Sequence, residues 1–339
     1  MLKSKASLSR VRVKDVAKAA GVSVATVSRS FNLPHDVRPD LRDNVLKIAA
    51  EMGYIPNSSA KALRLQKTNV IGAIIPTLDH SIYASMINSF QRVLGEYGYV
   101  VYILTCGFDS RHIYEKVKLL SDRGAEALLI VGEVVDPQLI EYLEMHRLPV
   151  VCAYSYHKEG RFPFIGFDNY GATQKIVKYL LGLGHRNLAM VTGPMAGNDR
   201  QQSRYQAFVD TLSEHKGCLY ITFESAQNYT IDYGVNIMRK IHSEHPEVTA
   251  VICNSDVIAM GVLSACRKLN ISVPDQLSVV GYDNLEFASH LEPPLTTLAI
   301  PAEAMGIQSA EALIARLHSN IEVRSQQLET ELIIRGSSQ

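Results

Sequence analysis

Residues 13–32 of this chain read VKDVAKAAGVSVATVSRSFN, and they hold two short helical patterns on either side of a glycine. The apolar residues before the glycine recur at helical spacing, which predicts a helix over residues 14–20 with one apolar face. Gly21 permits the left-handed backbone that ends such a helix. Ser23 stands at the N-cap position of a second helix. Two short helices joined by a glycine-containing turn predict a helix-turn-helix, whose second helix enters the major groove of DNA.

The two faces of the second predicted helix differ in chemistry. Val27 faces back toward Val16 and closes a small core, whereas the opposite side carries the candidate DNA contacts. A planar arginine side chain suits O6 and N7 of guanine, and small apolar side chains can touch a thymine methyl. Hydroxyl and amide groups can bond phosphates, which fixes register without reading sequence. An ordinary helical hairpin with a solvated face is the alternative. The candidate base contacts are Val24, Ala25 and Arg29, and the candidate phosphate contacts are Ser23, Ser28 and Asn32.

A third helix and a connecting segment follow. Pro39 suits the first position of a helix, and the apolar spacing predicts a helix over residues 40–52 that Gly53 ends. Residues 59–65 carry the pattern of a further helix, which is too short to be stable alone in water, and a disordered linker is the alternative. We therefore expect a DNA-binding head over residues 1–56 and a hinge helix or linker over residues 57–68.

Charge is distributed unevenly, although the chain of 339 residues carries no net charge. Residues 1–67 hold 13 Lys and Arg against 5 Asp and Glu, a balance of +8, while the remaining residues hold 21 against 29, a balance of −8. A basic N-terminal part joined to an acidic body is typical of a nucleic-acid-binding head. Residues 1–10 lack the apolar segment of a secretion signal, and no apolar run approaches membrane-spanning length. We therefore expect a cytoplasmic protein without a membrane partner.

Composition and motifs argue against metal, cofactor and enzyme chemistry. The five cysteines are odd in number, widely spaced and without a CxxC pair, which predicts free thiols. The histidines form no HExxH pattern, so we expect neither a metal nor a cofactor. The chain has no GxGxxG after a predicted strand, no Walker loop and no GxSxG. We therefore expect no enzyme and assign no catalytic residue.

From residue 69 onward, short apolar runs alternate with helical stretches. The runs VIGAIIP, YVVYILT, ALLIVG and PVVCAYS are followed, after FDNYG, by NLAMVTG, YITFE, TAVICN and LSVVGYD. Apolar strands that alternate with helices form parallel sheets covered on both faces. We therefore predict a small all-α head followed by an α/β core of two doubly wound parallel-sheet lobes. Ligands of such sheets bind at the carboxyl ends of the strands, which here implies a cleft between the lobes.

The chain resembles the lactose repressor/galactose repressor (LacI/GalR) family of bacterial transcriptional regulators. The resemblance lies in KDVAKAAGVSVATVSRSFN and GYIPNSSAKAL, and then, in the family's order, in FDNYGA, LLGLGHRNLAMVTGP, CNSDVIAMG, VPDQLSVVGYDN, PPLTTL and ELIIRGS. It implies an effector-binding and dimerisation core over residues 69–339 that is similar to periplasmic binding proteins. The N-lobe would then comprise residues 69–167 and 301–329, and the C-lobe residues 168–300 and 330–339.

The same resemblance assigns a role to the connecting segment. In the family, the segment that matches residues 57–68 is a hinge helix that orders on DNA, pairs with its dimer mate and places a leucine in the minor groove. Leu63 takes that place here, with Ala60 beside it. Apolar wedges of this kind partly unstack a base step and kink the duplex.

Polar side chains near the predicted strand ends are the candidate effector contacts. Asp283 follows VVGY, Ser255 follows VICN, and Arg204 lies in the helical stretch after VTGPMAGN. A carboxylate, an arginine and an aromatic ring together suit a carbohydrate. The resemblance implies that Arg204 and Asp283 contact an effector directly and that Tyr83 and Tyr229 pack on it.

Residues next to two of the candidate contacts, Ser255 and Tyr83, have other expected roles. Asp256 is expected to be the N-cap of the helix VIAMGVLSAC. His80, Ser81 and Ile82 stand where the family usually has Asn-Pro-Phe, so the wall of the pocket is altered and a known sugar preference does not transfer to this chain.

These observations predict an effector-responsive regulator of transcription, a repressor of carbohydrate-utilisation genes that binds a palindromic operator as a homodimer. A small molecule in the cleft, a sugar or a sugar derivative, would change the angle between the lobes and thereby the operator affinity. One alternative is the same kind of regulator with a nucleoside or purine as corepressor. Another, which residues 69–339 alone would allow, is a sugar-binding protein without a regulatory role.

Overall fold

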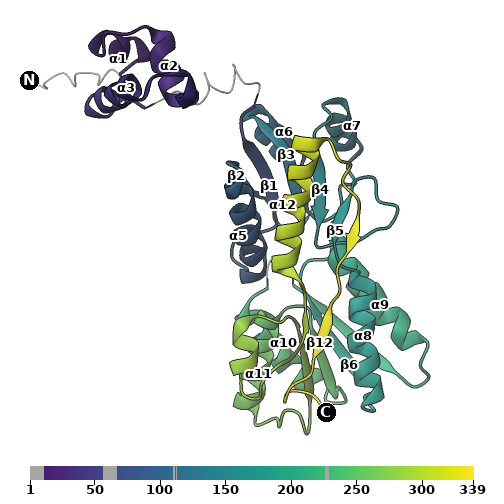
Figure 1. Ribbon diagram of the computed structural model, residues 1–339. Coiled ribbons are helices and arrows are strands. Elements are labelled where there is room, and N and C mark those ends of the chain that lie inside the picture. Colours follow the sequence, from purple (N-terminus) through teal and green to yellow (C-terminus); the bar gives the residue numbers. More distant parts are fainter. Residues whose placement is uncertain (1–10, 56–66, 110, 112, 226–228) are drawn as a thin grey trace, which may run out of the picture. The chain divides into compact units, whose positions relative to one another are not determined.

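The structure is a computed structural model that describes residues 11–55, 67–109, 111, 113–225 and 229–339. The chain divides into two compact units, Met1–Thr68 and Asn69–Gln339 (Figure 1). The predicted helix over residues 59–65, with Ala60 and Leu63, lies outside the described residues.

The described part of the first unit is helical. Val16, Val27 and Val45, one from each α-helix, are fully buried and pack together with Ala17 and Ala49. Gly21 has a φ of +66°, so the turn after the first helix uses the left-handed backbone that glycine permits. The predicted helix-turn-helix is confirmed, and its first helix begins and ends one residue earlier than predicted. The elements are α1 Val13–Ala19, α2 Val24–Asn32, the 3-10 turn η1 Pro34–Asp36 and α3 Pro39–Glu51.

The described residues of the second unit form two six-stranded sheets. The first has the order β11-β5-β4-β3-β1-β2, and the second has the order β12-β10-β9-β8-β6-β7. The strands of the first sheet are β1 Val70–Ile75, β2 Val100–Thr105, β3 Ala125–Val131, β4 Val150–Ala153, β5 Phe164–Gly166 and β11 Gln326–Gln327. Those of the second are β6 Asn187–Thr192, β7 Leu219–Glu224, β8 Ala250–Cys253, β9 Ser278–Asp283, β10 Thr296–Ala299 and β12 Glu331–Ile333.

Each sheet with its helices makes one lobe. All strand pairs are parallel except β10 with β12, and strands such as β1 and β8 are buried at every residue because helices cover both faces. The two doubly wound lobes predicted from the sequence are therefore confirmed. The first lobe holds α5 Ser81–Glu96, α6 Tyr114–Asp122, α7 Pro137–Met145 and α12 Ala302–Ser319, and the second holds α8 Asn169–Gly182, α9 Asp199–Ser213, α10 Ile231–Glu244, α11 Asp256–Leu269 and the 3-10 helix η3 Glu286–His290.

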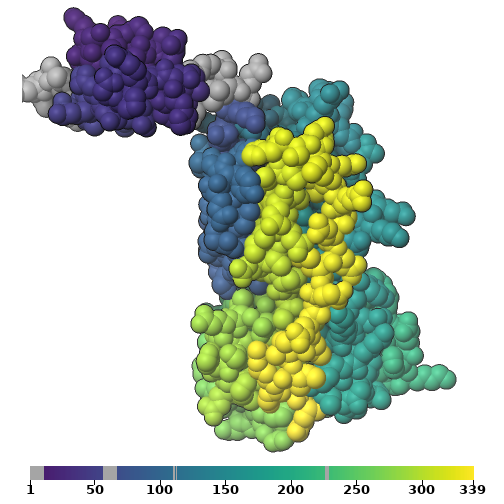
Figure 2. Space-filling model, viewed as in Figure 1, coloured from purple at the N-terminus to yellow at the C-terminus, as the bar shows by residue number. Residues whose placement is uncertain are grey.

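Within the described chain, the backbone passes between the lobes at three places. It leaves the first sheet after β5 to form α8, returns after β10 to form α12, and crosses again between β11 and β12. α12 packs against α5, and Figure 2 shows the two helices side by side on the surface of the first lobe. Three parallel connections allow the lobes to change their angle without unfolding either sheet.

The expectations about membrane-spanning segments and about the cysteines can be compared with the described residues. No helix among them has the length and apolar character that are needed to cross a membrane. All five cysteines lie among these residues, and all are free thiols, as predicted.

Candidate DNA-reading helix and interlobe cavity

α2 buries one face and exposes the other. Val27 and Ser30 are buried against the other helices of the first unit, whereas Val24 is 46% exposed and Ala25 and Arg29 are exposed as well. The three candidate base contacts therefore lie on the exposed side of the helix, as its pattern predicts.

The candidate phosphate contacts also have bonds inside the head. Oγ of Ser23 accepts a hydrogen bond from the backbone N of Thr26 at 3.1 Å, which makes Ser23 the N-cap of α2. Nδ2 of Asn32 donates to the carbonyl oxygen of Ser28 at 2.8 Å. These bonds hold α2 in shape, and the phosphate contacts of Ser23, Ser28 and Asn32 stay a prediction.

Arg29→Ala is expected to reduce discrimination at one base pair of each operator half-site by about 1–3 kcal/mol, because an arginine that reads guanine contributes about this much. The head keeps its fold, since Arg29 is exposed and outside the core of the first unit. Selection of binding sites from randomised DNA measures the effect. Arg38→Ala is the control, because it removes an equal charge from an exposed residue outside α2. An unchanged motif for Arg29→Ala contradicts the assignment.

A small cavity of about 30 Å³ lies where the two lobes meet. In each sheet the order of the strands reverses next to the second strand from one edge, which is β1 in the first sheet and β6 in the second. Side chains that follow the carboxyl ends of the strands at this place reach the cavity. The structure brings together all five residues that were predicted as effector contacts. The lining residues are His80, Ile82, Tyr83, Tyr154, Arg200, Gln201, Arg204, Tyr229, Asn254, Ser255 and Asp283.

A larger groove of about 1010 Å³ adjoins this cavity and shares Ile82 and Asp283 with it. The groove is lined by parts of α5, η3 and the start of α12. Of the five predicted effector contacts, only Asp283 lines it. The smaller cavity, where all five converge, is therefore the candidate effector site.

Neutral groups hold the buried guanidinium of Arg204. Its Nε donates to Oδ1 of Asn169 at 2.9 Å, and its Nη1 donates to the carbonyl oxygen of Asn254 at 3.2 Å. Its Cζ lies 3.6 Å from the centroid of the Tyr282 ring, in the position of a cation–π contact. Nδ2 of Asn169 in turn donates to the carbonyl oxygen of Tyr154 in the first lobe at 2.8 Å. Arg204 is thus fixed in place and connected to both lobes.

Asp283 ends β9 in a strained backbone conformation, with a φ of +110°. Its Oδ2 accepts a hydrogen bond from Oγ of Ser255 at 3.3 Å. Burial, with a further contribution from the nearby Asp256, raises the pKa of Asp283 well above its usual range. This shift favours the protonated carboxyl, which both donates and accepts a hydrogen bond.

The expectation that Asp256 is the N-cap of α11 is wrong. Ser255 is the N-cap, because its Oγ accepts from the backbone N of Val257 at 3.3 Å. Asp256 is the first residue of the helix and fully buried, and it accepts from Oγ1 of Thr297 at 2.6 Å and from the backbone N of Leu285 at 2.7 Å. Donors from neighbouring segments thus bind the carboxyl group that the sequence alone would place over the helix end.

The buried Asp256 makes the stability of the second unit depend on pH. Burial raises its pKa from 3.8 to about 7. Between these values the folded state binds more protons than the unfolded state, so the free energy of unfolding falls as pH rises, by about 4 kcal/mol over the window. Asp256→Asn is expected to flatten this slope in urea unfolding followed from pH ~4 to ~7. The exposed Asp232→Asn is the control, and an unchanged slope in Asp256→Asn contradicts the assignment.

Aromatic rings form much of the cavity wall. The centroids of Tyr83 and Tyr154 lie 5.0 Å apart, and Tyr229 lies 5.3 Å from His80 and 5.0 Å from Phe108. A Cβ at Gly193 would overlap the ring of Tyr229, so this position must be small. Burial raises the pKa of the hydroxyl groups of Tyr83 and Tyr229, which keeps them protonated. The wall thus offers flat apolar faces with hydroxyl donors at their edges.

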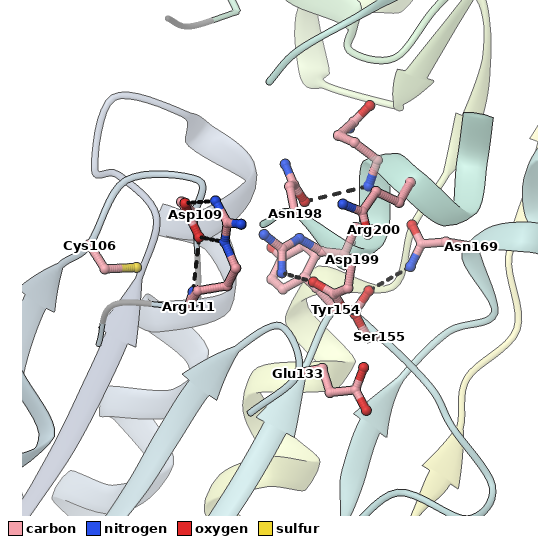
Figure 3. A network of polar contacts seen from close by, with 12 residues as sticks. Cys106, Asp109, Arg111, Glu133, Tyr154, Ser155, Asn169, Asn198, Asp199 and Arg200 are labelled. Atoms are coloured by element: carbon pink, nitrogen blue, oxygen red, sulfur yellow. Dashed lines mark hydrogen bonds and ion pairs between the residues drawn. The ribbon is translucent and has the colours of Figure 1, made fainter. Parts of the chain in front are cut away.

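A polar network crosses between the lobes at the cavity (Figure 3). Asp199 of the second lobe forms an ion pair with Arg200 and accepts a hydrogen bond from Oγ of Ser155 in the first lobe. Beside it, a Cβ at Gly197 would overlap Oδ1 of Asp109, so the loops of the two lobes are in close contact there. These contacts connect the two lobes beside the cavity.

Sequence reasoning missed several lining residues that it had the means to find. Tyr154 directly follows β4, and Asn254 directly follows β8, so both are at strand ends. Arg200 lies four residues before Arg204 on α9, and residues at this spacing share one face of a helix. The approximate strand ends and this helical spacing can be recognised in the sequence. Neither property distinguishes a residue that contacts a ligand from one that has a structural role.

Two family models match the chain. The one described as bacterial regulatory proteins, lacI family, matches residues 12–57, which include the described helix-turn-helix. The one described as a periplasmic binding protein-like domain matches residues 177–338. The two matches agree with the head and the core that the structure describes.

Curated relatives and a solved structure match over nearly the whole chain. The HTH-type transcriptional repressor CytR of Escherichia coli (strain K12) is 28% identical over 338 residues, which are 99% of this chain and 99% of that protein. The ribose operon repressor of Haemophilus influenzae is 28% identical over 327 residues, 96% of this chain and 98% of that protein. The crystal structure of the lac repressor dimer bound to operator and the anti-inducer ONPF has the same fold, with a TM-score of 0.83 at 24% identity over 97% of this chain and 99% of that one.

Proposed function

Because this chain belongs to the lacI family of bacterial regulatory proteins, we propose that it represses transcription as a homodimer on a palindromic operator, with an affinity set by a small molecule in the interlobe cavity. The protein is a DNA-binding transcriptional regulator with an effector-binding core. The gene set we propose is one for carbohydrate use, as the name of the related ribose operon repressor indicates for that relative.

The small volume of the cavity is the observation that supports control by an effector. A volume of about 30 Å³ has room for only a few water molecules. A sugar therefore enters only when the lobes separate or the lining side chains move. Since Tyr83 and Tyr154 come from the first lobe and Arg204 and Asp283 from the second, ligand binding depends on the angle between the lobes. The ligand changes the populations of the lobe arrangements by its difference in affinity for them.

The change in the core has to reach the DNA-binding head. We propose a head of residues 1–56, a hinge of residues 57–68 and a core of residues 69–339, with the lobe limits given above. Val24, Ala25 and Arg29 read bases in the major groove, and Ala60 and Leu63 of each hinge enter the minor groove. Two heads bind two half-sites, so a change in dimer geometry alters the spacing of the hinges and with it the operator affinity.

A sugar or a sugar derivative is the proposed effector. Arg204 donates hydrogen bonds to its hydroxyl groups, and Asp283 exchanges hydrogen bonds with them. Ser255 donates to Asp283, and Tyr83 and Tyr229 pack on the ring. The contacts of Tyr229 with His80 and Phe108 favour a second candidate, a nucleoside or purine that acts as corepressor, because they offer planar faces to a base.

Two alternative functions, sugar binding without regulation and catalysis, have less support. A sugar-binding protein without a regulatory role would not need the helix-turn-helix of residues 11–55. We propose no catalytic role, in line with the names of the relatives, which are regulators. Since operator DNA in bacteria lies in the cytoplasm, we propose that the protein acts there.

Operator selection with the purified full-length protein tests this function. We expect an inverted repeat to be selected and to bind about 1000-fold or more tightly than random duplex at moderate salt. Fluorescence anisotropy on that duplex is then repeated with sugars, sugar acids and nucleosides, and at least one is expected to change the affinity. A protein that binds every duplex equally well, with and without these compounds, contradicts the proposal.

A further inference from the structure

Arg200 places a second buried guanidinium in the interlobe cavity. It is the second residue of α9, is 3% exposed and lines the cavity one helical turn before Arg204. The side chain of Arg200 fits because Gly132, which directly follows β3, has no side chain, and a Cβ there would overlap Nη1 of Arg200. Burying a charged side chain costs free energy unless charges and hydrogen bonds compensate it, so Arg200 requires compensating partners.

Most of the hydrogen-bonding capacity of Arg200 is unused. Among the described residues, its hydrogen bond is the one from Nη1 to Oδ1 of Asp199, at 2.9 Å. A guanidinium has further N–H donors in a planar arrangement that fits the two oxygens of a carboxylate or a phosphate. Asp199 also accepts a hydrogen bond from Ser155, so its charge is shared.

Near Arg200 lie a second positive charge and an oxygen atom that can accept a hydrogen bond from a ligand hydroxyl group. The hydrogen bonds of Arg204 go to the neutral side chain of Asn169 and to a carbonyl group, and Asp283 has a raised pKa that favours its neutral form. In the described part of the chain, Oδ1 of Asn254 is buried in this site without a hydrogen-bond partner. The cavity therefore joins unused cationic donors to an unused acceptor.

We propose that the effector is a polyhydroxylated compound with a compact oxyanion, a carboxylate or a phosphate, which binds Arg200 while a hydroxyl group donates to Asn254. This inference rests on the proposed function, since it concerns the same cavity. A neutral sugar satisfies the acceptor but leaves the buried cation with a single shared carboxylate. An anionic ligand satisfies both, and its charge compensates the two arginines.

The competing explanation is that Arg200 only serves, with Asp199, to tie the lobes together. In that case Arg200→Gln and Asp199→Asn both weaken the contact between the lobes, and they change ligand affinity in the same direction. If Arg200 binds an oxyanion, the two substitutions act in opposite directions. Arg200→Gln removes the binding group, whereas Asp199→Asn removes a competing negative charge and leaves the guanidinium free for the ligand.

The test uses matched probes with the full-length protein. Thermal unfolding is measured with glucose, gluconate and glucose 6-phosphate, with ribose and ribose 5-phosphate, and with adenosine and adenosine monophosphate. At least one anionic probe is expected to raise the melting temperature more than its neutral parent does. The acid and phosphate arms distinguish the two sources of the oxyanion. Titration calorimetry then gives the Kd of the best anionic probe.

For that probe, Arg200→Gln is expected to weaken binding roughly 10- to 100-fold, because it removes charge-assisted hydrogen bonds. Asp199→Asn is expected to keep or increase the affinity, and Arg200→Lys to retain part of it as a point charge. Arg239→Gln, at an exposed residue of α10, removes an equal charge and is expected to change nothing. The double variant Asp199→Asn/Arg200→Gln removes both charges of this ion pair together, so its thermal unfolding checks that a loss is not caused by one charge left unpaired.

Three results overturn the inference. They are an equal response to each neutral parent and its anion, a lack of binding by every anionic probe, and an equal loss of affinity in Arg200→Gln and Asp199→Asn. In each case the operator assay decides separately about the function. Retained preference for an inverted repeat, with its affinity changed by any compound of the panel, leaves the regulator intact and rejects only the anionic effector.

Discussion

Replacing Gly261 with alanine is expected to destabilise the second unit by about 2–4 kcal/mol. Gly261 on α11 lies against Gly234 on α10, and a Cβ at Gly261 would overlap the carbonyl oxygen of Ile231 and come within 3.0 Å of Cα of Gly234. These are backbone atoms, which cannot rotate away as a side chain does. The two helices must therefore separate, and the apolar contacts between them are lost along their length.

Urea unfolding of the full-length protein, with a signal from the second unit, measures this effect. Gly95→Ala is the matched control, because Gly95 lies in the helix α5, is exposed and has open space where the Cβ would be. Alanine favours helix more than glycine does, so this control is expected to gain about 0.5–1 kcal/mol. Equal stability of Gly261→Ala and the unmodified chain means that α10 and α11 are not in the close contact described.

Local patterns in the sequence predicted the helix-turn-helix and eight of the described strands, β1–β4 and β6–β9, but not the short strands β5, β10, β11 and β12. The spacing of Val16 and Val27 and the position of Gly21 depend on neighbouring residues, and the predicted helix-turn-helix is found with a shift of one residue in α1. The apolar runs of the core are strands for the same reason, because continuous burial of a parallel strand leaves a continuous apolar sequence.

Contacts between distant residues were beyond local patterns. Asp256 meets the local rule for an N-cap, yet Thr297 and Leu285, which are far away in sequence, bind its carboxyl group. The close approach of Gly234 and Gly261 likewise depends on how two helices cross. Nothing in the spacing of these glycines distinguishes them from glycines in open space, such as Gly95.

The candidate site lies between these two cases. A general property of parallel sheets, ligand binding at the carboxyl ends of strands, directed attention to Ser255 and Asp283, and the family resemblance added the roles of Arg204, Tyr83 and Tyr229. All five line one cavity. Their closeness is a property of the fold, whereas the contacts that hold them, such as that of Asn169 with Arg204, follow from side-chain packing that the sequence does not display.

Asp283→Ala is expected to weaken effector binding roughly 100-fold while operator affinity without effector stays the same. The proposed role of Asp283 is to exchange hydrogen bonds with a ligand hydroxyl, and the substitution also leaves Oγ of Ser255 without its acceptor. The proposed operator contacts belong to the first unit, and Asp283 lies in the second. Anisotropy of labelled operator, titrated with the effector found by screening, measures both quantities on one sample.

A glycine variant separates the effect of the side chain from that of the backbone. Asp283 has a φ of +110°, where alanine is strained and glycine is not, so Asp283→Gly removes the carboxyl group without the strain. Equal losses in the alanine and glycine variants assign the effect to the carboxyl group. A loss in Asp283→Ala that Asp283→Gly lacks assigns it to the backbone.

Asp283→Asn then reports the protonation state in which the group works. Asparagine is a neutral group with one donor side and one acceptor side, as a protonated carboxyl is, and it tolerates positive φ. Because burial raises the pKa of Asp283, we expect Asp283→Asn to retain effector affinity to within about tenfold. A loss as large as that of Asp283→Ala means that the ionised carboxylate binds the effector. The cavity would then hold an anion beside Arg204, which favours a neutral polyol over the anionic ligand inferred from Arg200.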